Sequence, residues 1–160
     1  MRKLIFVFGF ILLTSLGMAQ ETKHAIGLRL GGGEGFGSEI SYQYGLSSLN
    51  RMEFDLGMSS THLYNAWGLA GIYQWVWNID KGINWYAGAG GRIGSWNWDT
   101  NNYTGSNSSG LFLSAAGDVG VEYTFPIGIQ LSLDARPELG LINHGDAFSN
   151  SIALSVRYRF

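Results

Sequence analysis

Several carboxylates in this chain lie at a spacing that could support acid–base chemistry. Glu53 and Asp55 are two residues apart, and Asp134 and Glu138 lie two residues on either side of Arg136. In an extended strand this spacing puts the side chains on one face, where one carboxyl could act as general acid and another as general base. The same spacing also suits ion pairing with arginine, because a carboxylate and a guanidinium form paired hydrogen bonds. We favour a structural salt-bridge network over catalysis by these acids.

A second possible site lies in the segment Asn143–Asn150. His144 and Asp146 are two residues apart there, with Ser149 and Ser151 nearby. Serine, histidine and an acid are the groups that hydrolases and acyltransferases use. However, the chain has no G-x-S-x-G nucleophile elbow, and Asn, Gly and Asp also form ordinary turns. We therefore expect a solvated loop here and no catalytic residue.

Metal, cofactor and nucleic-acid chemistry have little support. The chain has no cysteine, and its three histidines, His24, His62 and His144, are far apart in sequence, whereas metal sites need clustered ligands. Acidic residues number 12 and basic residues 10, so no basic surface is available for a polyanion. We expect no metal, no cofactor and no nucleic-acid partner.

The charged residues lie on segments in which every second residue is apolar. In the last segment Leu154 and Val156 alternate with Ser155 and Arg157, and this period of two is typical of a β-strand. The mature chain is therefore predicted to be all-β, with eight antiparallel strands in an up-and-down barrel. Their approximate ranges are 23–31, 36–45, 49–59, 63–77, 84–95, 111–125, 129–141 and 151–160.

The composition of the polar register indicates which face of these strands lies outside. A soluble lipocalin-like barrel would put its aliphatic side chains inside and its charges in water. Here the polar register carries arginines and acids but no lysine, together with many Gly, Ser and Ala residues. Arginine suits carboxylate pairing in a confined space, so we predict a membrane barrel with a salt-bridged, side-chain-filled lumen. The predicted lumen residues are Arg29, Glu39, Arg51, Glu53, Asp55, Arg92, Asp118, Glu122, Asp134, Arg136, Glu138, Arg157 and Arg159.

The connections differ in length between the two ends of the predicted barrel. Leu46–Leu49, Asn78–Ile83 and Pro126–Gly128 are short and lie at the end of the chain termini. Ser95–Ser109 and Asn143–Asn150 are longer and lie at the other end. Outer-membrane barrels have short periplasmic turns and longer extracellular loops, so both termini are predicted to be periplasmic.

Aromatic residues on the apolar register gather beside the short turns. Such a girdle marks the membrane–water interface, and outer-membrane lipid is the expected partner. A separate aromatic group in the longer loop, Trp96, Trp98 and Tyr103, could contact an extracellular ligand or serve in rim packing. The predicted interface residues are Tyr42, Tyr44, Tyr73, Trp75, Trp77, Trp85, Tyr123, Phe125, Tyr158 and Phe160.

Pro137 interrupts the strand pattern. It lies on the apolar register inside the segment 129–141, and proline cannot donate a hydrogen bond to a neighbouring strand. Either a β-bulge or an early end of the barrel rim is expected there.

The C-terminal residues Tyr158-Arg159-Phe160 resemble the end of outer-membrane β-barrel proteins. The pattern, strand number and terminus together resemble the small eight-stranded class that includes OmpX and the OmpA transmembrane domain. The resemblance implies a cell-envelope protein of a Gram-negative bacterium with a porin-like fold. It also implies that the barrel-insertion machinery recognises Phe160.

The first 19 residues are typical of a secretory signal peptide. Arg2 and Lys3 precede an apolar run from Leu4 to Leu16, and Gly17-Met18-Ala19 supplies small residues for cleavage. Residues 1–19 are thus a predicted signal peptide, and residues 20–160 a single barrel domain. The favoured function is a non-enzymatic outer-membrane protein with an envelope-structural or loop-binding role. A lipid-modifying acyl hydrolase or transferase on the same barrel, and a narrow channel, are the alternatives.

Overall fold

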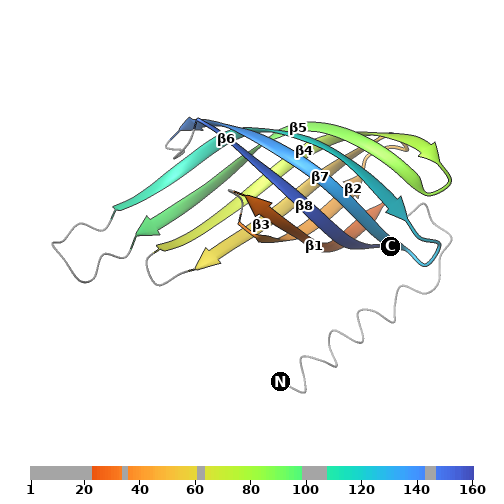
Figure 1. The fold of residues 1–160 in the computed structure, drawn as a ribbon, viewed down its shortest axis with the longest axis horizontal. Coiled ribbons are helices and arrows are strands. Elements are labelled where there is room, and N and C mark those ends of the chain that lie inside the picture. Colours follow the sequence, from red (N-terminus) through yellow and green to blue (C-terminus); the bar gives the residue numbers. More distant parts are fainter. Residues whose placement is uncertain (1–22, 34–35, 61–63, 99–107, 143–146) are drawn as a thin grey trace, which may run out of the picture.

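The computed structural model is a closed barrel of eight antiparallel strands (Figure 1). It describes residues 23–33, 36–60, 64–98, 108–142 and 147–160, so the predicted signal peptide lies outside the described residues. No helix in these described ranges is long and apolar enough to cross a membrane. The strands are β1 (His24–Gly33), β2 (Ser38–Gly45), β3 (Asn50–Ser60), β4 (Tyr64–Asp80), β5 (Ile83–Trp98), β6 (Ser108–Thr124), β7 (Ile129–Ile142) and β8 (Phe148–Arg159).

All eight predicted strands are confirmed, and the differences are at their ends. β5 continues to Trp98 and β6 begins at Ser108, so the predicted loop Ser95–Ser109 is too long at both ends. Trp98 pairs with Ser108 and Asn97 with Ser109. Cross-strand hydrogen bonding therefore extends the ladder into polar sequence, where the apolar alternation no longer marks a strand.

The first and last strands close the barrel. β1 and β8 pair from Ala25 opposite Arg159 to Gly33 opposite Ser151. Every other strand pairs with its neighbours in sequence, which makes this an up-and-down barrel without a free sheet edge. Backbone amides are consequently paired within the sheet, which is the condition for strands to stand in hydrocarbon.

The short turns and both described chain ends lie at one end of the barrel, here called the turn-side end. The backbone amide of Phe160 donates to His24 O over 2.9 Å, and that of Arg159 donates to Gly128 O over 2.8 Å. Gly128 has a φ of 84°, which a residue with a Cβ rarely adopts. The opposite end, where β5 stops and β6 starts, is called the loop-side end (Figure 1).

Burial in this barrel is the reverse of that in a soluble protein. Outward side chains such as Leu28, Val121 and Leu154 are about half exposed. The buried residues in the described part of the chain, in contrast, include seven acids and five arginines. The core is thus polar and the outer surface apolar, as the residue types on the two registers predict.

Pro137 lies inside β7 without a bulge, and the two expected explanations for it were wrong. Ala116 pairs with Glu138 and Val119 with Ala135, so β6 and β7 keep one register across the proline. Between these pairs Pro137 faces Gly117, where an added Cβ would lie 3.4 Å from the proline ring. The register shift is nearer the loop-side end, at Leu113/Ser114. A glycine neighbour accommodates the ring, and the strand continues.

Candidate functional site

The centre of the lumen is built around the Arg136 guanidinium from β7. Its Nη2 lies 2.8 Å from Glu53 Oε1 and its Nη1 2.7 Å from Asp55 Oδ2. Glu39 and Asp118 lie further away, each 3.8 Å from one of its nitrogens. Strands β2, β3, β6 and β7 thereby converge on one cation that is fully buried.

Glu53 is the carboxylate that joins this cation to a second one. Its Oε2 lies 3.1 Å from Arg157 Nη2, and the same oxygen accepts hydrogen bonds from Gln43 Nε2 at 2.6 Å and Gln74 Nε2 at 3.2 Å. Arg157 in turn donates to Ser41 and Ser132, both over 2.8 Å. A buried carboxylate needs this degree of pairing, since desolvation of an unpaired charge is very costly.

A second layer lies toward the loop-side end and centres on Glu39. Arg29 Nη1 is 3.0 Å from one of its oxygens and Arg92 Nη2 is 2.7 Å from the other. Arg29 also contacts Asp134 over 2.5 Å, and Arg92 lies 3.4 Å from Glu138. The two arginines thus link β1, β2, β5 and β7 across the lumen.

A third layer lies at the turn-side end. Arg51 Nη1 is 2.7 Å from Glu122 Oε2, and Arg51 Nε donates to Gln74 over 2.5 Å. The guanidinium carbon is 4.8 Å from the centre of the Tyr86 ring, a cation–π distance. Glu122 also accepts from Asn84 Nδ2 at 3.1 Å.

These contacts place the predicted lumen residues as follows. All of them except Arg159 are buried, and Arg159 is half-buried at the turn-side mouth. The two carboxylate pairs singled out as possible acid–base groups both lie among arginines. Their arrangement neutralises the buried charges and holds them in place across the lumen.

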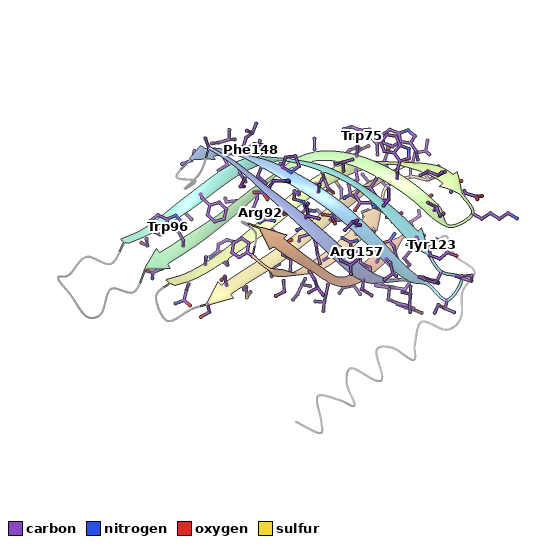
Figure 2. All side chains as sticks on the ribbon, viewed as in Figure 1. Trp75, Arg92, Trp96, Tyr123, Phe148 and Arg157 are labelled. Carbon is purple, nitrogen blue, oxygen red and sulfur yellow. The ribbon has the colours of Figure 1, made fainter. Side chains whose placement is uncertain are left out.

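The predicted interface aromatics lie near the turn-side end, where Figure 2 shows Trp75 and Tyr123. The rings of Trp77 and Trp85 stack with centroids 4.4 Å apart. Tyr73 packs edge-on against Trp75 with centroids 5.0 Å apart. Tyr42 is half-buried, and its hydroxyl is 2.8 Å from His24 Nδ1.

The loop-side end of the lumen contains an aromatic cluster that the alternation pattern did not identify. Phe36 begins the predicted strand 36–45 and is an even number of residues from the outward-facing Ile40. Its ring nevertheless lies inside the barrel, 5.4 Å from the Arg92 guanidinium carbon and 6.5 Å from the Phe112 ring. The cause is Gly37, which directly precedes β2. Its φ of 79° breaks the alternation of side chains between the two faces. We call Phe36, Trp96 and Phe112 the loop-side aromatic cluster.

Inward-facing glycines make room for this cluster. A Cβ on Gly57 or Gly68 would lie 2.6 Å from Phe36, and one on Gly94 would lie 2.5 Å from Phe112. A Cβ on Gly110 would lie 2.8 Å from Trp96. Gly94 lies on the inward register two residues after Arg92, and it pairs with Gly68, which in turn pairs with Gly57. Glycines on the charged register are the sequence signal that could have revealed the cluster.

The other candidate residues have the following positions. Trp96 and Trp98 were expected in a loop, but both lie in β5, because strand pairing with β6 continues to Trp98. Trp96 is half-buried at the loop-side end (Figure 2). Tyr103, His62, His144 and Asp146 lie outside the described residues. Among the residues that the structure does describe, no group of His, Cys, Asp and Glu could hold a metal ion.

Comparison with solved structures shows the fold class. The N-terminal β-barrel domain of Pseudomonas aeruginosa OprF is 16% identical, with 88% of this chain and 100% of that chain covered and a TM-score of 0.67. Neisserial surface protein A is 16% identical, with coverages of 86% and 94% and a TM-score of 0.61. Ail, the attachment invasion locus protein of Yersinia pestis, is 14% identical, with coverages of 86% and 96% and a TM-score of 0.56.

No protein-family model and no curated protein sequence matches the chain. At these identities the likeness to solved structures establishes the fold alone. The chain has the fold of small eight-stranded outer-membrane β-barrels, as its strand number and terminus led us to expect.

Proposed function

We propose that the protein is a non-enzymatic integral barrel of the bacterial outer membrane, with an envelope-structural or loop-binding role. The observation that carries this proposal is the inverted burial of its side chains. Among the residues that the structure describes, twelve charged side chains are buried in the lumen, and large apolar side chains stand half exposed around the outside.

Energetics favour a lipid environment for the outer surface. Soluble monomers rarely expose a continuous apolar patch of more than a few hundred Å², whereas apolar side chains are exposed here on all eight strands. Each Å² of such surface in water would cost roughly 25 cal/mol. In hydrocarbon this cost disappears, and the closed ladder leaves no sheet edge to solvate.

Side chains fill the lumen at its centre and at its loop-side end. This packing supports a function that is carried out by the loops or by the outer surface of the barrel. Arg136, Arg157 and Glu53 are fully buried at the centre of the lumen. The loop-side aromatic cluster fills the lumen between Arg92 and the loop-side end. An eight-stranded barrel is just wide enough for its own side chains. Exchange with a partner would therefore take place at the loops or at the lipid-facing surface.

The proposed orientation puts the turn-side end in the periplasm, with both termini, and the loop-side end outside the cell. It is supported by the short turns at Lys81-Gly82 and Pro126–Gly128 and by the aromatic pairs near them. Phe160, half exposed beside His24, would be the contact for the barrel-insertion machinery.

Expression in a Gram-negative host tests the membrane placement. We expect the protein in the outer-membrane fraction, with faster gel migration when unboiled than when boiled, because a closed barrel resists detergent. Recovery from the soluble periplasm without a mobility shift would refute the proposal.

Two further measurements separate the proposed role from enzymatic and channel functions. Mass spectra of lipid A and phospholipids should be the same with and without the protein. Planar bilayers containing the purified protein should show no discrete conductance steps. Altered acyl chains would establish a lipid-modifying enzyme, and conductance steps would establish a channel.

A further inference from the structure

The buried lumen holds more acids than bases. In the described part of the chain its buried side chains include seven carboxyls and five guanidiniums. Arg159 is half-buried at the turn-side mouth, and counting it with the lumen still leaves one carboxyl in excess. Lys23 and Lys81 are exposed, so water solvates their charges. A buried charge without a partner is very costly, and the lumen therefore favours a neutral form of one of its acids.

Asp118 is the buried carboxyl with the longest ion pair. Each of the other six has an oxygen between 2.5 and 3.4 Å from a guanidinium nitrogen, whereas Asp118 Oδ2 is 3.8 Å from Arg136 Nη2. The same oxygen accepts a hydrogen bond from Gln74 Nε2 at 2.5 Å. The other oxygen, Oδ1, is buried and has no hydrogen-bond partner. An ionised Asp118 would therefore leave a carboxylate oxygen without compensation and away from water.

The cation beside Asp118 is shared with acids that lie closer to it. Arg136 is 2.8 Å from Glu53 and 2.7 Å from Asp55, so two other carboxylates already use its charge. Where carboxyls share one site, repulsion between like charges keeps one of them protonated. The charged and titratable groups that face Asp118 from other strands include Glu53 on β3, Tyr86 on β5, and Asp134 and Arg136 on β7.

We propose that the lumen binds a proton at Asp118, so that this side chain is a neutral carboxylic acid at neutral pH while well-paired acids such as Asp134 are ionised. The count of buried charges and the pairing distances lead to this assignment independently. The proton removes the uncompensated negative charge, and Oδ2 keeps its hydrogen bond from Gln74. The site goes beyond the proposed function and depends only on the closed, charged lumen.

Proton binding at this site makes the stability of the barrel depend on pH. An aspartate in the unfolded chain loses its proton near about pH 4. Above that pH the folded state therefore holds one more proton than the unfolded state, and its stability falls as the pH rises. From about pH 5 upward, the equilibrium constant for unfolding should rise by up to about tenfold per pH unit, until Asp118 is deprotonated in the folded barrel as well.

Two variants with the same substitution test the assignment by denaturant titration in phosphatidylcholine vesicles at constant ionic strength. Asp118→Asn copies the neutral acid, so the ratio of the unfolding constants of the unaltered protein and this variant should rise about 100-fold between about pH 5 and about pH 7. Asp134→Asn is the matched control, because Asp134 is also buried but pairs with Arg29 at 2.5 Å. It should destabilise the barrel by the same factor at both pH values. Equal pH dependence of Asp118→Asn and the unaltered protein would overturn the proposal.

Infrared spectroscopy supplies a measurement that does not require Asp118→Asn to fold. A carboxylic acid has a C=O stretching band that is separate from the bands of carboxylates. The unaltered barrel should show such a band at neutral pH and lose it at alkaline pH. The band should remain in Asp134→Asn and disappear in a folded Asp118→Asn. Absence of the band from the unaltered protein, or its loss in Asp134→Asn, would refute proton binding at Asp118. Stability that follows the sodium concentration instead of the pH would also refute it, since a bound cation would then balance the charge.

Discussion

At the scale of single residues, the lumen depends on a few groups that each pair with several others. Glu53 contacts both Arg136 and Arg157 and accepts from Gln43 and Gln74. Removing one charge from such a set leaves buried cations unpaired, which costs more than the pair itself contributes. The lumen charges should therefore differ greatly in their importance for stability.

Glu53→Gln should lower the free energy of unfolding by about 3 kcal/mol, because it leaves two buried arginines without their shared carboxylate. Denaturant titration of the folded barrel, monitored by tryptophan fluorescence, measures this. Asp80→Asn is the control, since Asp80 is exposed at the end of β4 and its substitution should change stability by less than about 0.5 kcal/mol. Equal effects from both variants would contradict the assignment of Glu53 as a shared partner.

The loop-side aromatic cluster gives a second residue-scale prediction. Phe36→Leu and Phe112→Leu should each destabilise the barrel, and the double variant should show a coupling energy of about 1 kcal/mol, typical of packed rings. The same denaturant titration supplies the four values of the cycle. Simple additivity would mean that the two rings, 6.5 Å apart, do not support each other.

At the scale of strands, the barrel depends on close contact where β1 meets β8. A Cβ on Gly27 would lie 1.9 Å from the carbonyl oxygen of Val156, whereas one on Gly32, in the same strand, would meet nothing within 4 Å. At Gly27, therefore, β1 has no room for a side chain, whereas at Gly32 it has.

Gly27→Ala should prevent or weaken closure of the barrel, because the backbone of β8 would have to move. The unboiled protein should then lose its fast-migrating form, or lose it at a lower temperature than the unaltered protein. Gly32→Ala is the matched control and should keep the fast form. A normal mobility shift for Gly27→Ala would show that closure tolerates a wider β1–β8 gap.

The strands and the direction in which each register faces could largely be predicted from the sequence. The period of two located all eight strands, and the arginines without lysine indicated which register faces the lumen. The pairing of particular charges could not be predicted, because Arg29 meets Asp134 from a strand 105 residues away and the stagger of the strands decides which side chains reach each other. The strand ends near Trp98 and Ser108 depend on pairing across the sheet, and the inward turn of Phe36 depends on one glycine.

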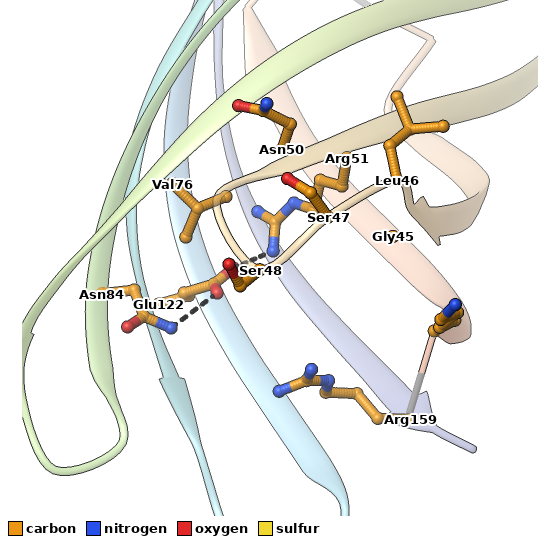
Figure 3. A pocket seen from close by; sticks show the side chains of 11 residues that line it. Gly45, Leu46, Ser47, Ser48, Asn50, Arg51, Val76, Asn84, Glu122 and Arg159 are labelled. Carbon is orange, nitrogen blue, oxygen red and sulfur yellow. Dashed lines mark hydrogen bonds and ion pairs between the residues drawn. The ribbon is translucent and has the colours of Figure 1, made fainter. Parts of the chain in front are cut away.

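The cavity at the turn-side mouth of the barrel, lined by Lys23, Arg51 and Arg159 among others, also could not be predicted from the alternation pattern (Figure 3). Lys23 and Arg159 come from opposite ends of the described chain, and Arg51 from the middle. Closure of the barrel brings them together, so their spacing in the sequence does not indicate the cavity.

At the scale of the whole molecule, the two faces of the barrel wall meet different surroundings. The apolar register surrounds the barrel and the charges fill it, so the protein should be stable in lipid and aggregate in water. The central claim is therefore that outward side chains such as Leu154 stand in hydrocarbon.

Because the chain contains no cysteine, single cysteines carrying spin labels test this claim directly. Leu154→Cys lies on the outward register and is half exposed, and Lys81→Cys lies in the exposed turn at the turn-side end. In lipid nanodiscs, the label at 154 should be relaxed more by oxygen than by a polar nickel chelate, and the label at 81 should show the reverse. A label at 154 that is relaxed mainly by the nickel chelate would contradict the account, since it would place the apolar face in water.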